Sequence, residues 1–112
     1  MPVPFYDNCL LPIEDDPSFV EVERIYCFDV DALSKEHLHR LNDIFGTLPG
    51  YQGVVDGSPM WFGLDEEVFP FLWASLEPPG LQVYGVVRPN QWKDWDTAFQ
   101  GSISDFPFRR EH

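Results

Sequence analysis

Hydrophobic and acidic residues alternate between Val20 and Val30, which is the clearest short-range pattern of the chain. A period of two residues is typical of a β-strand. Arg24 interrupts the apolar side of this pattern, and Ile25 and Cys27 make the other side more apolar. We therefore expect a strand at these positions whose second half is covered on both faces, as in the interior of a sheet.

The segment that follows has the spacing of a helix. Its hydrophobic residues recur on one helical face, at Leu38, Leu41, Ile44, Phe45 and Leu48. Ser34 can cap the start, so the pattern predicts a helix at residues 34–46. After this helix, Asp56-Gly57 supplies the positive φ angles of a tight turn, which predicts a hairpin of two strands at 51–55 and 60–64.

A second helix is predicted between Asp65 and Leu76. Asp65 can cap its start, and an apolar stripe follows at Phe69, Leu72, Trp73 and Leu76. Pro70 would lie one turn inside this helix and removes a backbone donor, so we expect the helix to start late or to bend. Residues 81–87 then predict a last strand, and Asn90 can cap a short C-terminal helix that carries three aromatic residues.

The order of these elements is strand, helix, strand, strand, helix, strand. It predicts an α+β fold of the ferredoxin-like βαββαβ type, an antiparallel sheet with helices on one face, plus the short C-terminal helix. We expect a single domain at 1–112, since a chain of 112 residues with 44% hydrophobic residues can bury one core. Prolines predict an irregular N-terminal arm at 1–18, and a lack of periodicity predicts an irregular tail at 102–112.

The charge of the chain restricts its partners. Nineteen acidic residues face seven basic ones, which gives a net charge of -12. Such a field repels nucleic acids and anionic lipid surfaces and speeds the encounter with a basic protein. The start of the chain has no signal-peptide pattern, and no apolar run is long enough to span a membrane. We therefore expect a cytoplasmic protein with a basic protein partner, without nucleic acid or membrane among its partners.

Residue types for a thiol hydrolase are present in Cys27, Asp29 and His37. Cys27 lies in the middle of the predicted strand, where an oxyanion site is not expected, so it is interpreted as structural. His37 and His39 point to different sides of a helix and cannot share a metal ion. The sequence thus predicts no catalytic residues, no metal, no cofactor and no enzymatic activity.

Acidic residues beside large aromatic residues are the candidate binding surface. Buried aromatics with a charged rim are typical of the residues that dominate protein interfaces. The predicted partner-binding residues are Trp61, Asp65, Glu66, Glu67, Asp94 and Asp96, together with the acidic run Glu14, Asp15 and Asp16.

Small size, strong acidity, abundant aromatic residues and missing catalytic motifs give a profile that is similar to that of bacterial immunity or antitoxin proteins. This resemblance implies an inhibitor that occludes the basic active site of a toxin. Two alternatives remain open at this point. One is a small-ligand-binding or catalytic domain that uses the open face of the sheet, and the other is a nucleic-acid mimic.

Overall fold

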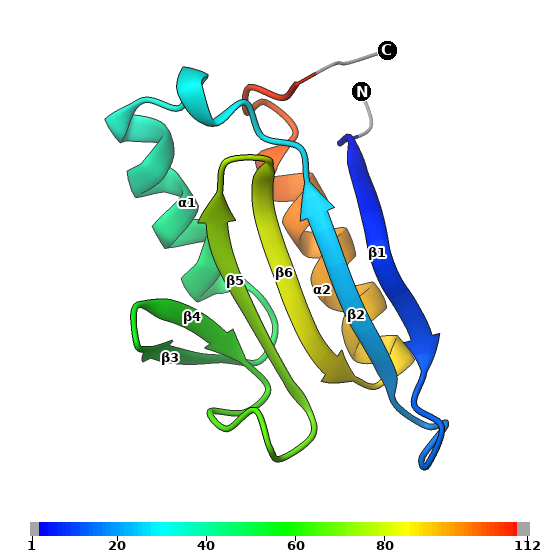
Figure 1. Ribbon diagram of the computed structural model, residues 1–112. Coiled ribbons are helices and arrows are strands. Elements are labelled where there is room, and N and C mark those ends of the chain that lie inside the picture. Colours follow the sequence, from blue (N-terminus) through cyan, green and yellow to red (C-terminus); the bar gives the residue numbers. More distant parts are fainter. Residues whose placement is uncertain (1–2, 110–112) are drawn as a thin grey trace.

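The computed structural model describes residues 3–109 and shows one antiparallel sheet of six strands, with two α-helices packed on one face (Figure 1). The spatial order of the strands is β1-β2-β6-β5-β4-β3. The elements are β1 (Phe5–Pro12), β2 (Val20–Tyr26), a 3-10 turn (Val30–Ala32), α1 (Lys35–Thr47), β3 (Tyr51–Val55), β4 (Ser58–Trp61), β5 (Phe71–Glu77), β6 (Gly80–Val87) and α2 (Pro89–Ile103). The α+β class is confirmed, whereas the ferredoxin-like topology is wrong, because that fold has four strands.

β2 lies inside the sheet, as the alternating pattern predicted. It pairs with β1 on one side and with β6 on the other. Val22 and Tyr26 point to the helix-covered face and are fully buried, while Glu21 and Glu23 lie on the opposite, open face. The strand ends at Tyr26, before the predicted end at residue 30.

α1 and the hairpin after it also match their predictions. Ser34 caps α1, and its side chain accepts a hydrogen bond from the backbone N–H of His37. Asp56 and Gly57 have φ angles of 51° and 84°, which is the conformation expected for the tight turn between β3 and β4. The predicted second strand is shorter than expected and ends at Trp61.

The helix predicted between Asp65 and Leu76 does not form. Residues 71–77 instead form β5, which pairs with β4 and β6. Both faces of β5 are covered at Phe71 and Leu72, so apolar residues occupy successive positions and match a helical stripe by coincidence. Pro70 immediately precedes the strand, where its missing N–H interrupts no ladder.

The N-terminal arm predicted as irregular at 1–18 contains a strand, and its residues 1–2 lie outside the described residues. Residues 5–12 form β1, an edge strand that pairs antiparallel with β2 and contains a register shift between Asp7 and Cys9. At the other end, α2 extends to Ile103 and is longer than predicted, and Phe108 forms an isolated bridge to Phe28. The last three residues of the predicted tail, 110–112, lie outside the described residues.

Hydrophobic residues gather on both faces of the sheet. The larger core lies between the sheet and the helices, with Trp61, Trp95 and Phe99 at its centre. A smaller cluster of four buried residues, Phe19, Met60, Phe71 and Val86, lies on the open face. This second cluster anchors the loops that surround the open face. Neither helix of the described chain is both long and apolar enough to cross a membrane.

Candidate functional site

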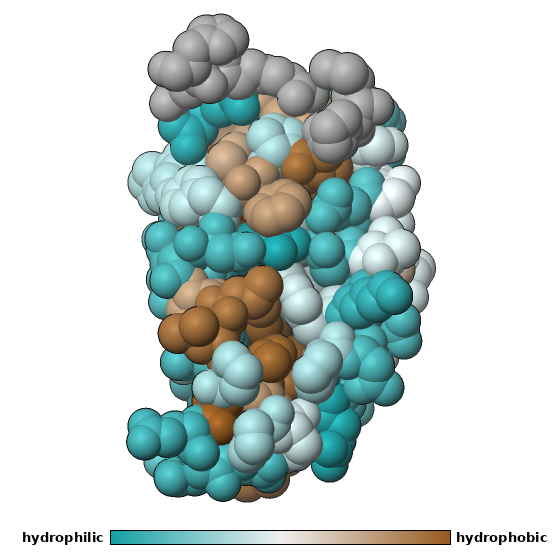
Figure 2. Space-filling model, turned by 90° about the vertical axis from the view of Figure 1, so that its right-hand side faces the viewer, coloured by the Kyte–Doolittle hydropathy of each residue, from teal (hydrophilic) through white to brown (hydrophobic). Residues whose placement is uncertain are grey.

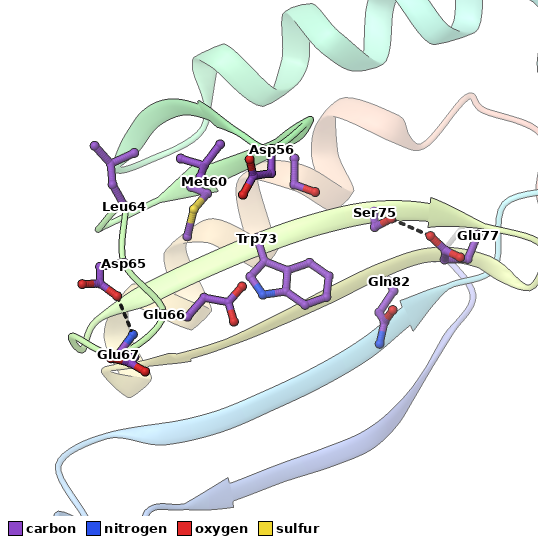
Figure 3. A pocket seen from close by; sticks show the side chains of 12 residues that line it. Asp56, Met60, Leu64, Asp65, Glu66, Glu67, Trp73, Ser75, Glu77 and Gln82 are labelled. Carbon is purple, nitrogen blue, oxygen red and sulfur yellow. Dashed lines mark hydrogen bonds between the residues drawn. The ribbon is translucent and has the colours of Figure 1, made fainter.

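A groove of about 700 Å³ lies on the open face of the sheet, between the β3–β4 hairpin, the loop at 62–70 and strands β5 and β6 (Figure 3). We call it the acidic groove. Five of its lining side chains are carboxylates, namely Asp56, Asp65, Glu66, Glu67 and Glu77. The other lining residues are Val55, Ser58, Met60, Leu64, Trp73, Ser75 and Gln82. The lining thus includes no lysine, arginine, histidine or cysteine.

Trp73 forms the floor of the groove. It lies on β5 opposite Met60 of β4 and Tyr84 of β6, and its ring centroid is 5.7 Å from that of Tyr84. Figure 3 shows the carboxylate of Glu66 pointing toward the edge of the Trp73 ring. A half-buried aromatic ring beneath carboxylates suits a cationic side chain, which gains from both the charges and the ring.

The loop at 62–70 forms the rim of the groove and exposes both acidic and apolar side chains. Leu64, Val68 and Phe69 are 52%, 61% and 43% exposed. The loop is ordered by its own polar contacts, because the Asp65 carboxylate accepts a hydrogen bond of 2.9 Å from the N–H of Glu67. Phe69 also packs against Phe19, with 5.7 Å between the ring centroids. The rim therefore presents apolar anchors without a large conformational cost.

Two further carboxylates, Glu21 and Glu23, lie on the open face beside the groove. The Tyr84 hydroxyl donates to Glu21 Oε2 at 2.8 Å, and Gln82 Nε2 lies 3.5 Å from Glu23 Oε2. Burial and the hydrogen bond to Glu21 raise the pKa of Tyr84 to about 12. The hydroxyl of Tyr84 is thus held as a neutral donor to a carboxylate.

This geometry predicts a late titration of Tyr84. The folded state favours the neutral phenol, so its contribution to stability is complete below the ordinary pKa of about 10 and is lost as the pH rises toward 12. In a spectrophotometric titration, the phenolate absorbance of wild type should exceed that of Tyr84→Phe only near pH 12. A difference that appears with a midpoint near pH 10 while circular dichroism remains native would contradict the predicted contact.

The predicted partner-binding residues occupy different parts of the molecule. Asp65, Glu66 and Glu67 are exposed and line the groove, as expected of a binding surface. Trp61 is fully buried, and its indole Nε1 donates to the carbonyl of Phe45 at 3.0 Å. The predicted partner-binding role of Trp61 therefore does not fit the structure, because its position on β4 points it into the main core.

Asp96 also has an internal role. Its Oδ1 accepts hydrogen bonds from Arg24 at 2.9 Å, from Tyr26 at 2.6 Å and from Gln100 at 2.9 Å. Burial and the charge of Asp96 raise the pKa of Tyr26 well above its usual value. Asp96 is thus occupied within the fold, while Asp94 is exposed on α2, which covers the face of the sheet opposite the groove.

Glu14, Asp15 and Asp16 are exposed in the loop between β1 and β2, and none of them lines the groove. Asp16 Oδ1 accepts hydrogen bonds from the hydroxyl and the N–H of Ser18, which lowers its pKa. This loop stands at the same end of the sheet as the loop at 62–70, since the two meet through Phe19 and Phe69.

Sequence reasoning missed Trp73, Asp56 and Glu77 as groove residues. Trp73 was assigned to a helical stripe, and the continuous apolar run at residues 71–74 has no period of two that could have indicated a strand. Asp56 was explained by the turn alone. Glu77 follows Ser75 on the same face of β5 and accepts its hydroxyl hydrogen bond at 2.6 Å.

Among the residues considered for catalysis and metal binding, His37 has a structural contact. The Nδ1 of His37 accepts a hydrogen bond of 3.0 Å from the N–H of Ser34, so this imidazole helps to start α1. Cys9 and Cys27 are not bonded to each other. Within residues 3–109, no cluster of three or more histidine, cysteine or acidic side chains is arranged to hold a metal ion.

Comparisons with protein-family models, with curated proteins and with solved structures find no match to this chain.

Proposed function

We propose that the protein is a non-enzymatic binding module that takes a basic segment of a partner protein into the acidic groove. The observation that carries this proposal is the lining itself, with five carboxylates, no basic side chain and the Trp73 ring as its floor. A lysine or arginine side chain satisfies both features of the groove. The exposed apolar residues of the rim would then bury the surface around these charge pairs, as in other protein interfaces.

The specific form of this proposal is an inhibitor of the immunity or antitoxin type, which occludes the basic active site of a toxin. The net charge of -12 supports it, because the field attracts a basic protein and repels its nucleic-acid substrate. A plug needs an exposed, preorganised element. The loop at 62–70 fits this requirement, because its residues 64–69 are exposed and its own contacts hold it in place.

A charge-reversal experiment tests the groove. We expect Glu66→Lys/Glu67→Lys to weaken the binding of a labelled hexa-arginine peptide by about tenfold or more at low salt, because it removes attraction and adds repulsion. The matched control is Glu36→Lys/Asp43→Lys on α1, whose exposed positions carry the same charges. Both variants change the net charge by four units, so the control should shift the affinity by less than about threefold through the overall field.

Two further measurements sharpen this test. Trp73→Ala should raise the dissociation rate of hexa-arginine more than it lowers the association rate, because the ring contacts the bound side chain. Higher salt should slow association far more than it speeds dissociation. Equal affinities of the groove variant and its α1 control, or equal binding of a hexa-glutamate peptide, would contradict the proposal.

A pull-down from native cytosol can identify the partner. Wild type and the Glu66→Lys/Glu67→Lys variant are used as bait in parallel. We expect a basic protein that wild type retains and the variant loses, and whose activity is inhibited by stoichiometric wild type. Retention of a small metabolite that displaces hexa-arginine would favour the small-ligand alternative. Retention of a nucleic-acid-binding protein that also requires Glu14, Asp15 and Asp16 would favour the mimic.

A further inference from the structure

The outer edge of β1 has no partner strand among the described residues. The carbonyl of Pro4 accepts from the N–H of Cys27 at 3.0 Å, and the N–H of Ile13 donates to Phe19 at 2.9 Å. These two bonds show which residues of β1 direct their backbone N–H and C=O groups toward β2. The alternation of an antiparallel ladder then directs the backbone groups of Phe5 and Leu10 away from β2. β1 therefore offers free donors and acceptors along a strand that is about 27 Å long.

This edge is also apolar on both faces. Phe5 and Tyr6 are 41% and 44% exposed, and Leu10 and Leu11 are 42% and 64% exposed. Figure 2 looks onto this side of the molecule and shows hydrophobic patches gathered among hydrophilic surface. Edge strands of proteins are usually protected by charged residues, prolines or bulges, and β1 has one proline, Pro12, and one register shift. The charged residue of β1 is Asp7, which is neutralised by a two-point ion pair with Arg24.

The order of residues in β1 is complementary to itself. The register shift between Asp7 and Cys9 divides the strand into one half with Phe5 and Tyr6 and another half with Leu10 and Leu11. A two-fold axis at Cys9 places the first half of one copy beside the second half of the other. Helix-side residues then meet helix-side residues, and open-face residues meet open-face residues, with the polar centre on the axis.

We propose that β1 pairs antiparallel with β1 of a second copy of the chain, so that two sheets join into one continuous sheet. Tyr6 lies opposite Leu11 of the other copy on the open side. On the helix side, Phe5 lies opposite Pro12 and diagonally across from Leu10 of the other copy. This pairing uses a different part of the sheet from the acidic groove, whose lining comes from β3, β4, β5, β6 and the loop at 62–70, while β2 separates β1 from β6.

The size of the interface sets the expected affinity. With 41% and 44% of their surface exposed, Phe5 and Tyr6 bring roughly 150 Å² of apolar surface per copy, given about 150–250 Å² for a whole aromatic side chain. The two leucines and the backbone add to this, which gives an interface at the small end of specific ones. We expect a dissociation constant on the order of 10–100 μM. Because each copy carries -12 charges, salt should strengthen the dimer, opposite to its effect on hexa-arginine binding.

Sedimentation equilibrium of the whole chain between about 1 and 500 μM measures this association. Leu11→Lys should weaken the dimer by at least about tenfold, because it places a charge on each side of the axis. The matched control is Val54→Lys on the opposite edge strand β3, since Val54 is 63% exposed and Leu11 is 64% exposed. Both variants should keep the wild-type unfolding transition and should bind hexa-arginine, which separates this test from that of the groove.

Cross-linking locates the axis. Cys9 lies at the proposed axis, so a short bis-maleimide should trap a dimer of wild type and of Cys27→Ser but not of Cys9→Ser. A monomer at every concentration and salt, a dimer that Val54→Lys breaks, or a cross-link that needs Cys27 would overturn the proposal. A monomer that instead adds a strand of another protein at β1 would overturn it as well.

Discussion

Replacing Arg24 by alanine should lower the free energy of unfolding by about 3–5 kcal/mol, because it leaves two carboxylates without their buried cation. Arg24 is 5% exposed. Its Nε lies 2.6 Å from Asp7 and its NH1 lies 2.9 Å from Asp96. The guanidinium also stands over the Phe5 ring at 3.7 Å from the centroid and over the Trp92 ring at 4.8 Å. One side chain thus joins β1, β2 and α2.

The charge of Arg24 is retained in spite of its burial. Burial opposes the charged form, but the hydrogen bond to Asp7 and the charges around it outweigh this effect and raise the pKa of Arg24. Removal of the cation therefore affects both carboxylates together. Arg24→Lys keeps the charge but loses the two-point contact with Asp7, so we expect an intermediate loss.

The chain contains a matched control for this prediction. Arg40 and Asp105 form an ion pair of 3.0 Å whose side chains are 47% and 64% exposed. Arg40→Ala should cost less than about 1 kcal/mol, because water screens the pair and replaces its hydrogen bonds. Urea unfolding followed by circular dichroism measures both variants. If the free energies of unfolding of Arg24→Ala and Arg40→Ala differ by less than about 1 kcal/mol, the ion pairs of Arg24 with Asp7 and Asp96 do not hold β1 to the helix layer.

The contacts of Arg24 with Asp7 and Asp96 also show which part of the fold the sequence could predict and which part it could not. The alternating pattern located β2 and showed that Arg24 interrupts its apolar side, but its partners are 17 and 72 positions away along the chain. β1 was not predicted because it, too, depends on contacts between residues that are far apart along the chain. Its prolines indicated an irregular arm, whereas pairing with β2 decides its conformation, and such long-range pairing leaves no local pattern.

α1 and the β3–β4 hairpin were predictable because local contacts define them, through the Ser34 cap and the Asp56-Gly57 turn. β5 was not, because a strand that is covered on both faces has no period of two. This error carried over to the binding surface. Asp65, Glu66 and Glu67 were predicted as partner-binding residues and line the groove, but Trp61, which was predicted beside them, lies in the core, and Trp73 lines the groove instead.

The two tryptophans differ in a way that a pair of variants can separate. Trp61 has no exposed surface and packs edge-on against Phe45 of α1 and Trp95 of α2, with ring centroids 5.5 and 5.0 Å away. Trp73 is partly exposed on the open face. Loss of the Trp61 side chain leaves a large cavity between the sheet and both helices, and it also deprives the Phe45 carbonyl of a donor.

Trp61→Ala should therefore lower the free energy of unfolding by about 3–5 kcal/mol, and Trp61→Phe by less, because phenylalanine fills much of the cavity without restoring the hydrogen bond. Trp73→Ala should cost less stability than Trp61→Ala but weaken hexa-arginine binding. Urea unfolding and peptide titration on the same three variants measure both quantities. A stable Trp61→Ala variant with lost peptide binding would contradict this assignment and return Trp61 to the binding surface. The reverse pattern, an unstable Trp61→Ala variant whose folded fraction binds normally, places Trp61 in the core and leaves recognition to the groove above Trp73.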